Sequence, residues 1–379
     1  MLRANLGRLL IYSGSFEEAR TVLMEAADLD PNDPAALYYF AQFARPDDAT
    51  TLIGRLNKID TNTIDAERQA MTAFALGKLH DISGEYDQAF EYFKKANTLS
   101  RPNYKHDLTV QFYQALKTVF ANGVPKASEP GSERLVFIVG MPRSGSSIVE
   151  ELLARNPDVV GLGERPEIPK TVGGIVRNHP NGYPGGLLKI SQEHFRGIAD
   201  ICLKQYDQQA NSARFIIDKN LRNFQHLGLI KILFPDAAII HCRRDPIAVC
   251  LSSYFQFFQD EPYTFSFEDI AQRYAAYEDL MSYWSQIFPG KIITQTYEDL
   301  VADKEGAITK LCGEIGMEHT LAQTSSDRVA NRDIQTTSAW QARQPIYKGA
   351  LAHWKNYEKH LGPLFEALDK AGVSYDGMG

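Results

Sequence analysis

A strand, a tight turn and the start of a helix follow one another within residues 134–154, and this stretch constrains the fold most. The run Leu135–Val139 is wholly apolar and includes three β-branched residues, as a strand buried in a parallel sheet requires. After the turn Gly140–Gly145, the hydroxyls of Ser146 and Ser147 stand where an apolar pattern of helical spacing begins. Backbone N–H groups and the helix dipole converge at such a turn, so the stretch predicts an anion-binding site.

The turn fits the phosphate-binding P-loop pattern G-x-x-x-x-G-K-[ST], except that Ser146 stands where the pattern has lysine. A second basic motif, His241–Pro246 (HCRRDP), follows an apolar run and precedes a helix that carries Ser252. Arginine suits this position because its planar guanidinium grips a phosphate through two N–H groups, and Arg244 and Ser252 could face one phosphate. Taken alone, such a motif is more often a solvated helix start, here capped by Asp245, and both interpretations stay open at this point.

Residues 132–379 alternate between strand and helix patterns, which predicts an α/β domain with a mostly parallel sheet and helices on both faces. The predicted strands are Leu135–Val139, Arg214–Asp218, Ala237–His241 and Lys291–Thr294. The predicted helices are Ile148–Arg155, His194–Gln209, Leu221–Phe234, Pro246–Phe258, Phe267–Ile287 and Lys304–Ile315. Ligands of such sheets bind at the carboxyl ends of the strands. Residues 168–190, rich in Gly and Pro, are expected to form a mobile loop over the site.

Residues 1–122 are predicted to form an all-α domain built from repeats. Leu6-Gly7, Gly14, Ala19, Leu23 and Ala26 return seventy residues later as Leu76-Gly77, Gly84, Ala89, Phe93 and Ala96. This spacing matches two periods of the tetratricopeptide repeat, so residues 34–67 should hold a degenerate middle repeat. Because the first repeat starts at Met1, we expect that end to pack on another element or to follow a further repeat. The domain either presents a concave surface to a protein partner or serves as a scaffold or dimerisation arm, and the Pro- and Gly-containing segment 120–132 separates it from the α/β domain.

Composition narrows the functional classes. A formal net charge of −7 and a pI near 5.8 argue against bulk nucleic-acid binding. The sequence has no run of eighteen apolar residues and no evident signal peptide, so we expect no membrane partner. Four cysteines without a C-x-x-C pair indicate a reduced, cytoplasmic protein. Scattered His and Cys residues predict no metal site.

Together, the lysine-free P-loop and the later strand-R-R-D-P-helix-Ser motif resemble the sulfotransferase superfamily, over roughly residues 134–370. The nearest likeness is to tyrosylprotein sulfotransferases and to bacterial sulfotransferases fused to tetratricopeptide repeats. The resemblance implies 3′-phosphoadenosine 5′-phosphosulfate (PAPS) as the donor. It implies that the 5′-phosphosulfate is held by Pro142, Arg143, Ser144, Gly145, Ser146 and Ser147. Arg143 is also implied as a catalytic residue, because it would reach the sulfuryl group. The resemblance also implies that the 3′-phosphate is held by Arg244 and Ser252, with Tyr297 near the nucleotide and Lys348 and Gly349 closing over it. Tyr347 departs from the family pattern, which has Arg at that place.

For the catalytic groups, the resemblance implies Glu164 as the base, 21 residues after Arg143, with Glu167 and His226 as competitors. A carboxylate beside a negatively charged donor becomes a better proton acceptor for a hydroxyl. Lys219 matches the family lysine that neutralises the leaving oxygen. Ser338 lies near the family's C-terminal catalytic serine, with a helix N-cap as its alternative role.

The predicted function is therefore in-line transfer of a sulfuryl group from PAPS to a hydroxyl acceptor. The acceptor is a peptide tyrosine by resemblance, with glycans, lipids and small molecules open; a protein partner on the repeats and a homodimer are also expected. The alternatives are a P-loop kinase or NTPase, and a repeat adaptor that binds nucleotide without catalysis.

Overall fold

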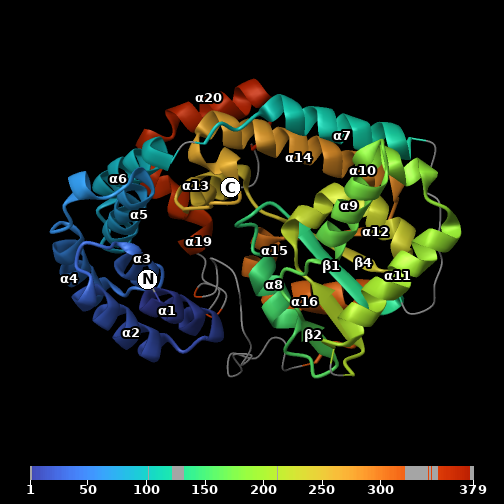
Figure 1. The fold of residues 1–379 in the computed structure, drawn as a ribbon, viewed down its shortest axis with the longest axis horizontal. Helices are drawn as coiled ribbons and strands as arrows, with labels where there is room; N and C mark the ends of the chain where they lie inside the picture. Colours follow the sequence, from blue (N-terminus) through green and yellow to red (C-terminus); the bar gives the residue numbers. More distant parts are fainter. Residues whose placement is uncertain are drawn as a thin grey trace. The chain divides into compact units, whose positions relative to one another are not determined.

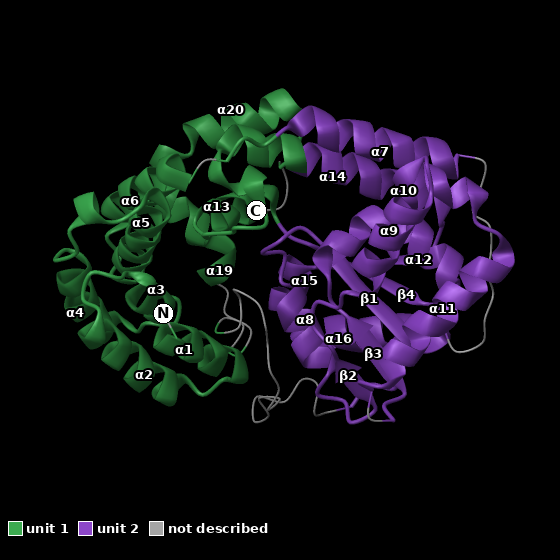
Figure 2. Ribbon diagram, in the orientation of Figure 1, with its two compact units in different colours: residues 1–104, 245–273, 331–379 green, residues 105–244, 274–330 purple. Residues whose placement is uncertain are grey.

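The structure is a computed structural model of the 379-residue chain. It describes residues 2–100, 102–121, 132–210, 212–320, 340, 343 and 349–375. The chain forms two compact units, coloured in Figure 2: unit 1 comprises residues 1–104, 245–273 and 331–379, and unit 2 comprises residues 105–244 and 274–330. The boundaries of these units differ from those of the predicted domains, 1–122 and 132–379. The predicted division into these two domains therefore stays a prediction.

The N-terminal part of unit 1 is a succession of helix pairs (Figure 1). Its helices are α1 (Leu2–Ser13), α2 (Phe16–Leu29), α3 (Ala35–Ala41), α4 (Pro46–Leu56), α5 (Ala66–Ile82) and α6 (Tyr86–Ser100). A Cβ at Gly77 would lie 2.8 Å from Cδ1 of Phe93, so α5 and α6 approach more closely than any side chain at residue 77 would permit. Residues 34–67, predicted to hold a degenerate middle repeat, form the two helices α3 and α4, whose Leu37 and Leu52 are buried.

The remainder of unit 1 comes from late in the chain. It comprises α13 (Pro246–Tyr254), η5 (Pro262–Phe265), the start of α14 (Phe267–Ile287), α19 (Gly349–Ala352), η6 (His353–His360) and α20 (Gly362–Ala371). Asn97 of α6 donates a hydrogen bond of 2.8 Å to the carbonyl of Tyr254, and Tyr357 of η6 donates one of 2.7 Å to Asp81 of α5. The repeat helices therefore share one core with segments that lie more than 150 residues further along the chain.

Unit 2 is built around a five-stranded sheet whose strands all run parallel. The strands are β1 (Leu135–Gly140), β2 (Val159–Gly161), β3 (Phe215–Asp218), β4 (Ala238–Arg243) and β5 (Ile292–Thr296), in the order β2-β3-β1-β4-β5. The predicted α/β class is confirmed, and the four predicted strands are present to within one or two residues. The short edge strand β2 escaped prediction because three residues carry no readable periodicity.

Helices flank this sheet. Those within unit 2 are α7 (His106–Phe120), α8 (Ser146–Leu153), α9 (Glu167–Asn178), α10 (Gly182–Gly185), α11 (Gln192–Asp207), α12 (Leu227–Leu233), residues 274–287 of α14, α15 (Tyr297–Ala302) and α16 (Lys304–Glu314), with the 3₁₀ turns η2 (Ser132–Arg134), η3 (Gly186–Lys189) and η4 (Leu221–His226). Phe137 of β1 packs its ring against Tyr206 of α11 and against Phe234, just after α12. These rings cover the centre of the sheet, so a ligand would bind at the carboxyl ends of the strands.

The expected mobile loop at residues 168–190 is wrong: this segment forms α9, α10 and η3. Its Ile168, Ile175 and Leu187 are each at most 3% exposed and belong to the core. The spacing of seven between Ile168 and Ile175 is a helical one, and this apolar spacing prevails over the local content of Gly and Pro.

Candidate functional site

The carboxyl edge of the sheet in unit 2 gathers one predicted site residue or turn from each strand. Gly140 at the end of β1 pairs with Cys242 of β4, and Arg243 at the end of β4 pairs with Thr296 of β5. The turn 141–145 follows β1, while Arg244 follows β4 and Tyr297 follows β5. On the other side of β1, Lys219 follows β3, and Glu164 stands three residues after β2.

The turn after β1 has the backbone of an anion cradle. Arg143 and Gly145 both have positive φ, 69° and 89°, which turns the chain sharply into α8. Gly145 is required twice over, because a Cβ there would lie 2.7 Å from Cδ2 of Tyr297. No side chain caps α8, and the hydroxyl of Ser144, which is 2% exposed, has no hydrogen-bond partner within the described residues. A buried unpartnered donor beside an uncapped helix start is the arrangement that an anion would satisfy.

Two guanidinium groups meet at this turn. Nη1 of Arg244 donates to the carbonyl oxygen of Arg143 at 3.3 Å, and the Arg244 guanidinium stacks 4.6 Å from the ring centroid of Tyr297. Burial, and next the charge of Arg244, lower the pKa of Arg143 to about 10. Arg143 is still protonated at neutral pH. Burial of its positive charge near Arg244 costs free energy, and a bound anion would lower that cost.

On the β2–β3 side, a buried ammonium meets a carboxylate. Nζ of Lys219 donates to Oε1 of Glu164 at 3.1 Å, and the Lys219 side chain is 1% exposed whereas that of Glu164 is 46% exposed. The Lys219 backbone N–H donates to the carbonyl of Gly163 at 2.9 Å, which ties the Glu164 loop to the end of β3. The structure thus brings together the two residues predicted as base and leaving-group cation.

Asp218, the last residue of β3, is a site residue that the sequence analysis missed. Its carboxylate accepts hydrogen bonds from Tyr206 Oη at 2.7 Å and from the backbone N–H of Asn220 at 3.1 Å. Burial raises the pKa of Asp218 to about 7, while these hydrogen bonds oppose the rise. The Asp218 carboxyl group fixes the backbone next to Lys219. In the sequence, the position of a single acidic residue at the end of an apolar strand could have indicated this role.

Glu150 of α8 was also missed. It is 1% exposed, and its Oε1 accepts a hydrogen bond of 2.9 Å from the backbone N–H of Gly163. The helix that begins at the anion turn is therefore coupled directly to the loop that carries Glu164. Nothing in the local sequence distinguishes Glu150 from its neighbour Glu151 as the residue that makes this bond.

The two competitors for the role of base are engaged otherwise. Glu167 is 2% exposed and accepts a hydrogen bond of 3.1 Å from Nε of Arg165. His226 shares a hydrogen bond of 3.1 Å between its Nδ1 and the hydroxyl of Tyr183, and burial lowers the pKa of His226 to about 4. Of the three candidates, Glu164 is the one that combines solvent exposure with contact to Lys219.

Four other predicted site residues belong to unit 1 or fall outside the described residues. Ser252 in α13 and Gly349 at the start of α19 belong to unit 1, whereas Arg244 belongs to unit 2. Ser338 and Lys348 fall outside the described residues. The roles of these four residues stay predictions.

Neither a metal centre nor a membrane span is seen in what the structure describes. Across those ranges, no three His, Cys, Asp or Glu side chains are grouped to hold a metal ion. None of the helices there combines the length and the apolar character needed to cross a bilayer.

Comparison with known proteins identifies the part of the chain that holds the site. Residues 136–321 match the model of the Sulfotransferase family. This segment is a sulfotransferase-family domain. Residues 2–33 and 72–103 match the model of the tetratricopeptide repeat. The predicted family and the predicted N-terminal repeats are confirmed. The prediction of an enzyme domain from a PAPS-dependent transferase family is also confirmed. The nearer likeness to tyrosylprotein sulfotransferases stays a prediction.

Individual relatives include proteins with and without an assigned activity. An uncharacterized protein of Aquifex aeolicus is 27% identical over 382 residues, which cover 96% of this chain and 50% of the relative. Heparan sulfate glucosamine 3-O-sulfotransferase 6 of Mus musculus is 24% identical over 53% of this chain and 58% of its own length. The chain thus spans about half the length of these curated relatives. Among solved structures, the sulfotransferase domain of the Synechococcus PCC 7002 olefin synthase is 22% identical, with a TM-score of 0.47 over 63% of this chain and 93% of that domain.

Proposed function

We propose that the sulfotransferase-family domain transfers a sulfuryl group from PAPS to a hydroxyl acceptor by in-line displacement. The observation that carries this proposal is the assembly of Arg143, Arg244 and Lys219 with the carboxylate of Glu164 along one edge of a parallel sheet. The three cations suit an anionic donor, and the exposed carboxylate suits a hydroxyl that must lose its proton.

The residues present fit the donor. The N–H groups at the start of α8, the Ser144 hydroxyl and the Arg143 guanidinium would hold the 5′-phosphosulfate. Arg244 would hold the 3′-phosphate, with Ser252, Lys348 and Gly349 as further proposed ligands. Tyr297 packs against the turn and under Arg244, so it would set the position of both.

The proposed sulfuryl transfer requires two contributions from this chain, charge stabilisation and proton transfer. When bound, the donor supplies an electrophilic sulfuryl group and a phosphate as leaving group. Glu164 accepts the proton of the acceptor hydroxyl, a contribution of about 10²–10⁴ in rate for a positioned base. Lys219 stabilises the negative charge that develops on the leaving oxygen, and loss of one such donor costs about 10²–10³ in rate. The ion pair between Glu164 and Lys219 holds both side chains in place before substrates arrive.

One observation weighs against a P-loop kinase or NTPase: Ser146 stands at the lysine position of the P-loop. A purely adaptor role is disfavoured by the contact of Lys219 with Glu164, since a nucleotide-binding scaffold needs no base.

The test compares nucleotides and then follows the transferred group. Calorimetry should show that adenosine 3′,5′-bisphosphate binds the full chain more tightly than ATP. Label from ³⁵S-PAPS should then enter a hydroxyl acceptor in the presence of the wild-type protein and not with Glu164→Gln, which should still bind the bisphosphate. A preference for ATP or GTP would exclude a sulfotransferase, and magnesium-dependent hydrolysis would favour an NTPase.

The setting of the reaction follows from the remaining features. All four cysteines are free and buried, as a reducing cytoplasm would keep them, and we place the protein there. Tetratricopeptide repeats commonly present a concave surface, so a protein partner on the helices α1–α6 and a homodimer are part of the proposal. A peptide tyrosine remains the acceptor that the family resemblance suggests.

A further inference from the structure

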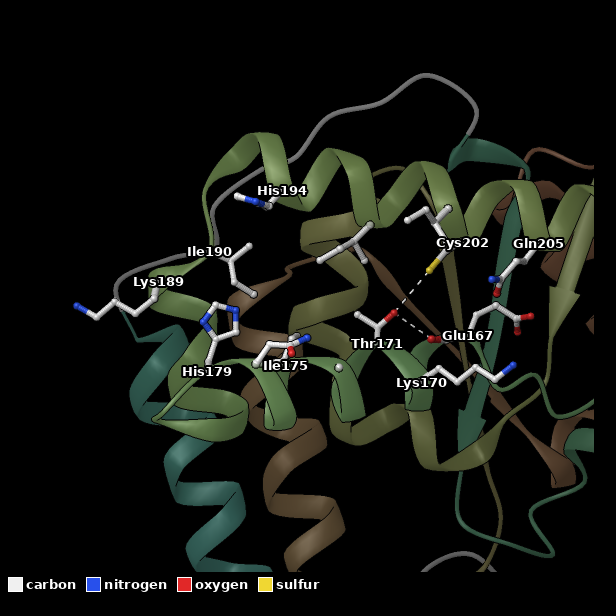
Figure 3. Close-up of a pocket in the computed structure, with 14 residues that line it drawn as sticks. Glu167, Lys170, Thr171, Ile175, His179, Lys189, Ile190, His194, Cys202 and Gln205 are labelled. Atoms are coloured by element: carbon white, nitrogen blue, oxygen red, sulfur yellow. Dashed lines mark hydrogen bonds between the residues drawn. The ribbon is translucent and has the colours of Figure 1, made fainter.

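A pocket separate from the anion turn lies between α9 and α11 (Figure 3). Its volume is about 560 Å³, within the range of sites that bury a small organic molecule. The apolar part of its lining comes from Ile175, Ile190, Ile198, Ile201 and Cys202. An apolar cavity of this size on a folded domain is a binding site for apolar material by default.

One lining residue of the pocket also reaches the protein surface. Ile201 of α11 lines the pocket and is 57% exposed. Leu188 of η3 and Val176 of α9 are 65% and 53% exposed on the segments that form the pocket, but neither lines it. An exposed apolar side chain on the wall of the cavity favours a ligand that continues out of it.

The two ends of the pocket differ in chemistry. One end is formed by Glu167 in the first turn of α9, and Glu167 is only three residues from Glu164. Three peptide units place the two Cα atoms within about 11 Å of each other. The other end is formed by His179, Lys189 and His194 (Figure 3). With a rise of 1.5 Å per residue, the path from Glu167 to His179 along α9 is about 18 Å.

The charges at the far end favour an anion. Lys189 takes part in no ion pair within the described ranges, and neither does Lys170 on the pocket wall. The carboxylate that lines the pocket, Glu167, is engaged by Arg165. A ligand with an apolar middle and an anionic end would therefore find complementary surroundings along the whole length of the pocket.

We propose that this pocket holds the acceptor, an extended aliphatic chain whose hydroxyl end reaches Glu164 and whose anionic end lies at His179, Lys189 and His194. The inference rests on the proposed sulfuryl transfer and names its substrate class. An aliphatic acceptor replaces the peptide tyrosine, because the pocket wall between its two ends is lined by Ile175, Ile190, Ile198, Ile201 and Cys202.

Two adjacent glycines of α9 provide the test. Gly174 lines the pocket, and a Cβ there would meet no atom within 4 Å, so we expect the side chain of Gly174→Leu to extend into the cavity. Gly173 does not line the pocket, and a Cβ there would make an ordinary contact of 3.5 Å with Arg177, so Gly173→Leu is the matched control. Both changes remove a glycine from a helix interior, which favours the folded helix.

Calorimetry with the full chain, saturated with adenosine 3′,5′-bisphosphate, uses ω-hydroxydodecanoate as the probe. We expect binding to the wild type and to Gly173→Leu, with affinity lowered about ten-fold or more in Gly174→Leu. The shorter ω-hydroxyhexanoate should bind about ten-fold or more weakly than the longer probe, because it buries fewer methylene groups. Lys189→Gln should weaken the carboxylate probe about two- to five-fold and leave uncharged dodecanediol unchanged.

The outcomes separate the two proposals. If the bisphosphate binds but affinity is independent of chain length, or Gly174→Leu binds like the wild type, the pocket inference is overturned while sulfuryl transfer stands. If the long probe binds in the pocket but ³⁵S from PAPS enters only a tyrosine peptide, the acceptor assignment is overturned. If the bisphosphate does not bind at all, it is the proposed function that fails.

Discussion

The ion pair between Lys219 and Glu164 makes a prediction about stability that is independent of any substrate. The Lys219 side chain is 1% exposed, so its ammonium has little access to water, whereas Glu164 at 46% exposure can be hydrated when unpaired. Removal of the carboxylate therefore leaves a buried charge without a counter-ion. Removal of the ammonium leaves only a carboxylate that water can solvate.

The magnitude follows from the distance between the two charges. At 3.1 Å, the Coulomb energy is about 5 kcal/mol for an effective dielectric constant near 20 and about 1 kcal/mol in bulk water. Because half of the pair is solvent-accessible, we expect Glu164→Gln to lower the free energy of unfolding by about 1–3 kcal/mol. Lys219→Met, which replaces the buried charge with an apolar chain of similar length, should cost less than Glu164→Gln, about 1 kcal/mol or under.

Urea unfolding followed by tryptophan fluorescence, without nucleotide, measures both single variants and the double variant. The double variant should resemble Lys219→Met, since Glu164→Gln no longer strands a charge. The exposed pair Lys204–Asp200, with N–O distance 2.7 Å and side chains 70% and 58% exposed, is the control, and Asp200→Asn should change the free energy of unfolding by about 0.5 kcal/mol or less. The reasoning is refuted if Lys219→Met costs more than Glu164→Gln, or if Glu164→Gln behaves like the exposed control.

Four further predictions concern the same unit. Arg143→Met should weaken binding of adenosine 3′,5′-bisphosphate by about ten- to a hundred-fold in calorimetry, since a charge-assisted hydrogen bond is lost; an unchanged dissociation constant would remove Arg143 from the donor site. Gly145→Ala should lower the free energy of unfolding by about 1–3 kcal/mol, because residue 145 has φ 89° and its Cβ would press on Tyr297; a thermal-shift assay equal to wild type would contradict this. Asp218 has its pKa raised from 3.8 to about 7, so its contribution to stability is present at low pH and is lost as the pH rises through 7; Asp218→Asn should lack this slope between pH 4 and 7 in urea titrations. His226 has its pKa lowered from 6.5 to about 4, so stability should fall as the pH drops from 6.5 to 4, and His226→Gln should show a smaller fall in the same titrations.

Local pattern in the sequence was enough for the elements that carry the anion turn. The apolar run at 135–139, the turn 140–145 and the helical spacing after Ser146 are contiguous, and the structure places β1 and α8 there. The seventy-residue repeat likewise predicted the helix pairs of unit 1, because small residues at fixed spacing are themselves the requirement for close helix contact. Alternation of strands and helices predicted the parallel sheet before any pairing was known.

The contacts that turn these elements into a site were decided only by the tertiary structure. Lys219 and Glu164 are 55 residues apart, and the hydrogen bond from Gly163 to Glu150 joins a loop to a helix that precedes it. Strand order, which sets β2 beside β3 and β4 beside β1, brings such residues together, and no local periodicity encodes it. Segment 168–190 shows the same limit, because local Gly and Pro content suggested a loop whereas burial of Ile168 and Ile175 makes it a helix. A short-range pattern in the sequence predicts which face of a segment will be buried. The element that packs against that face is decided by the whole fold.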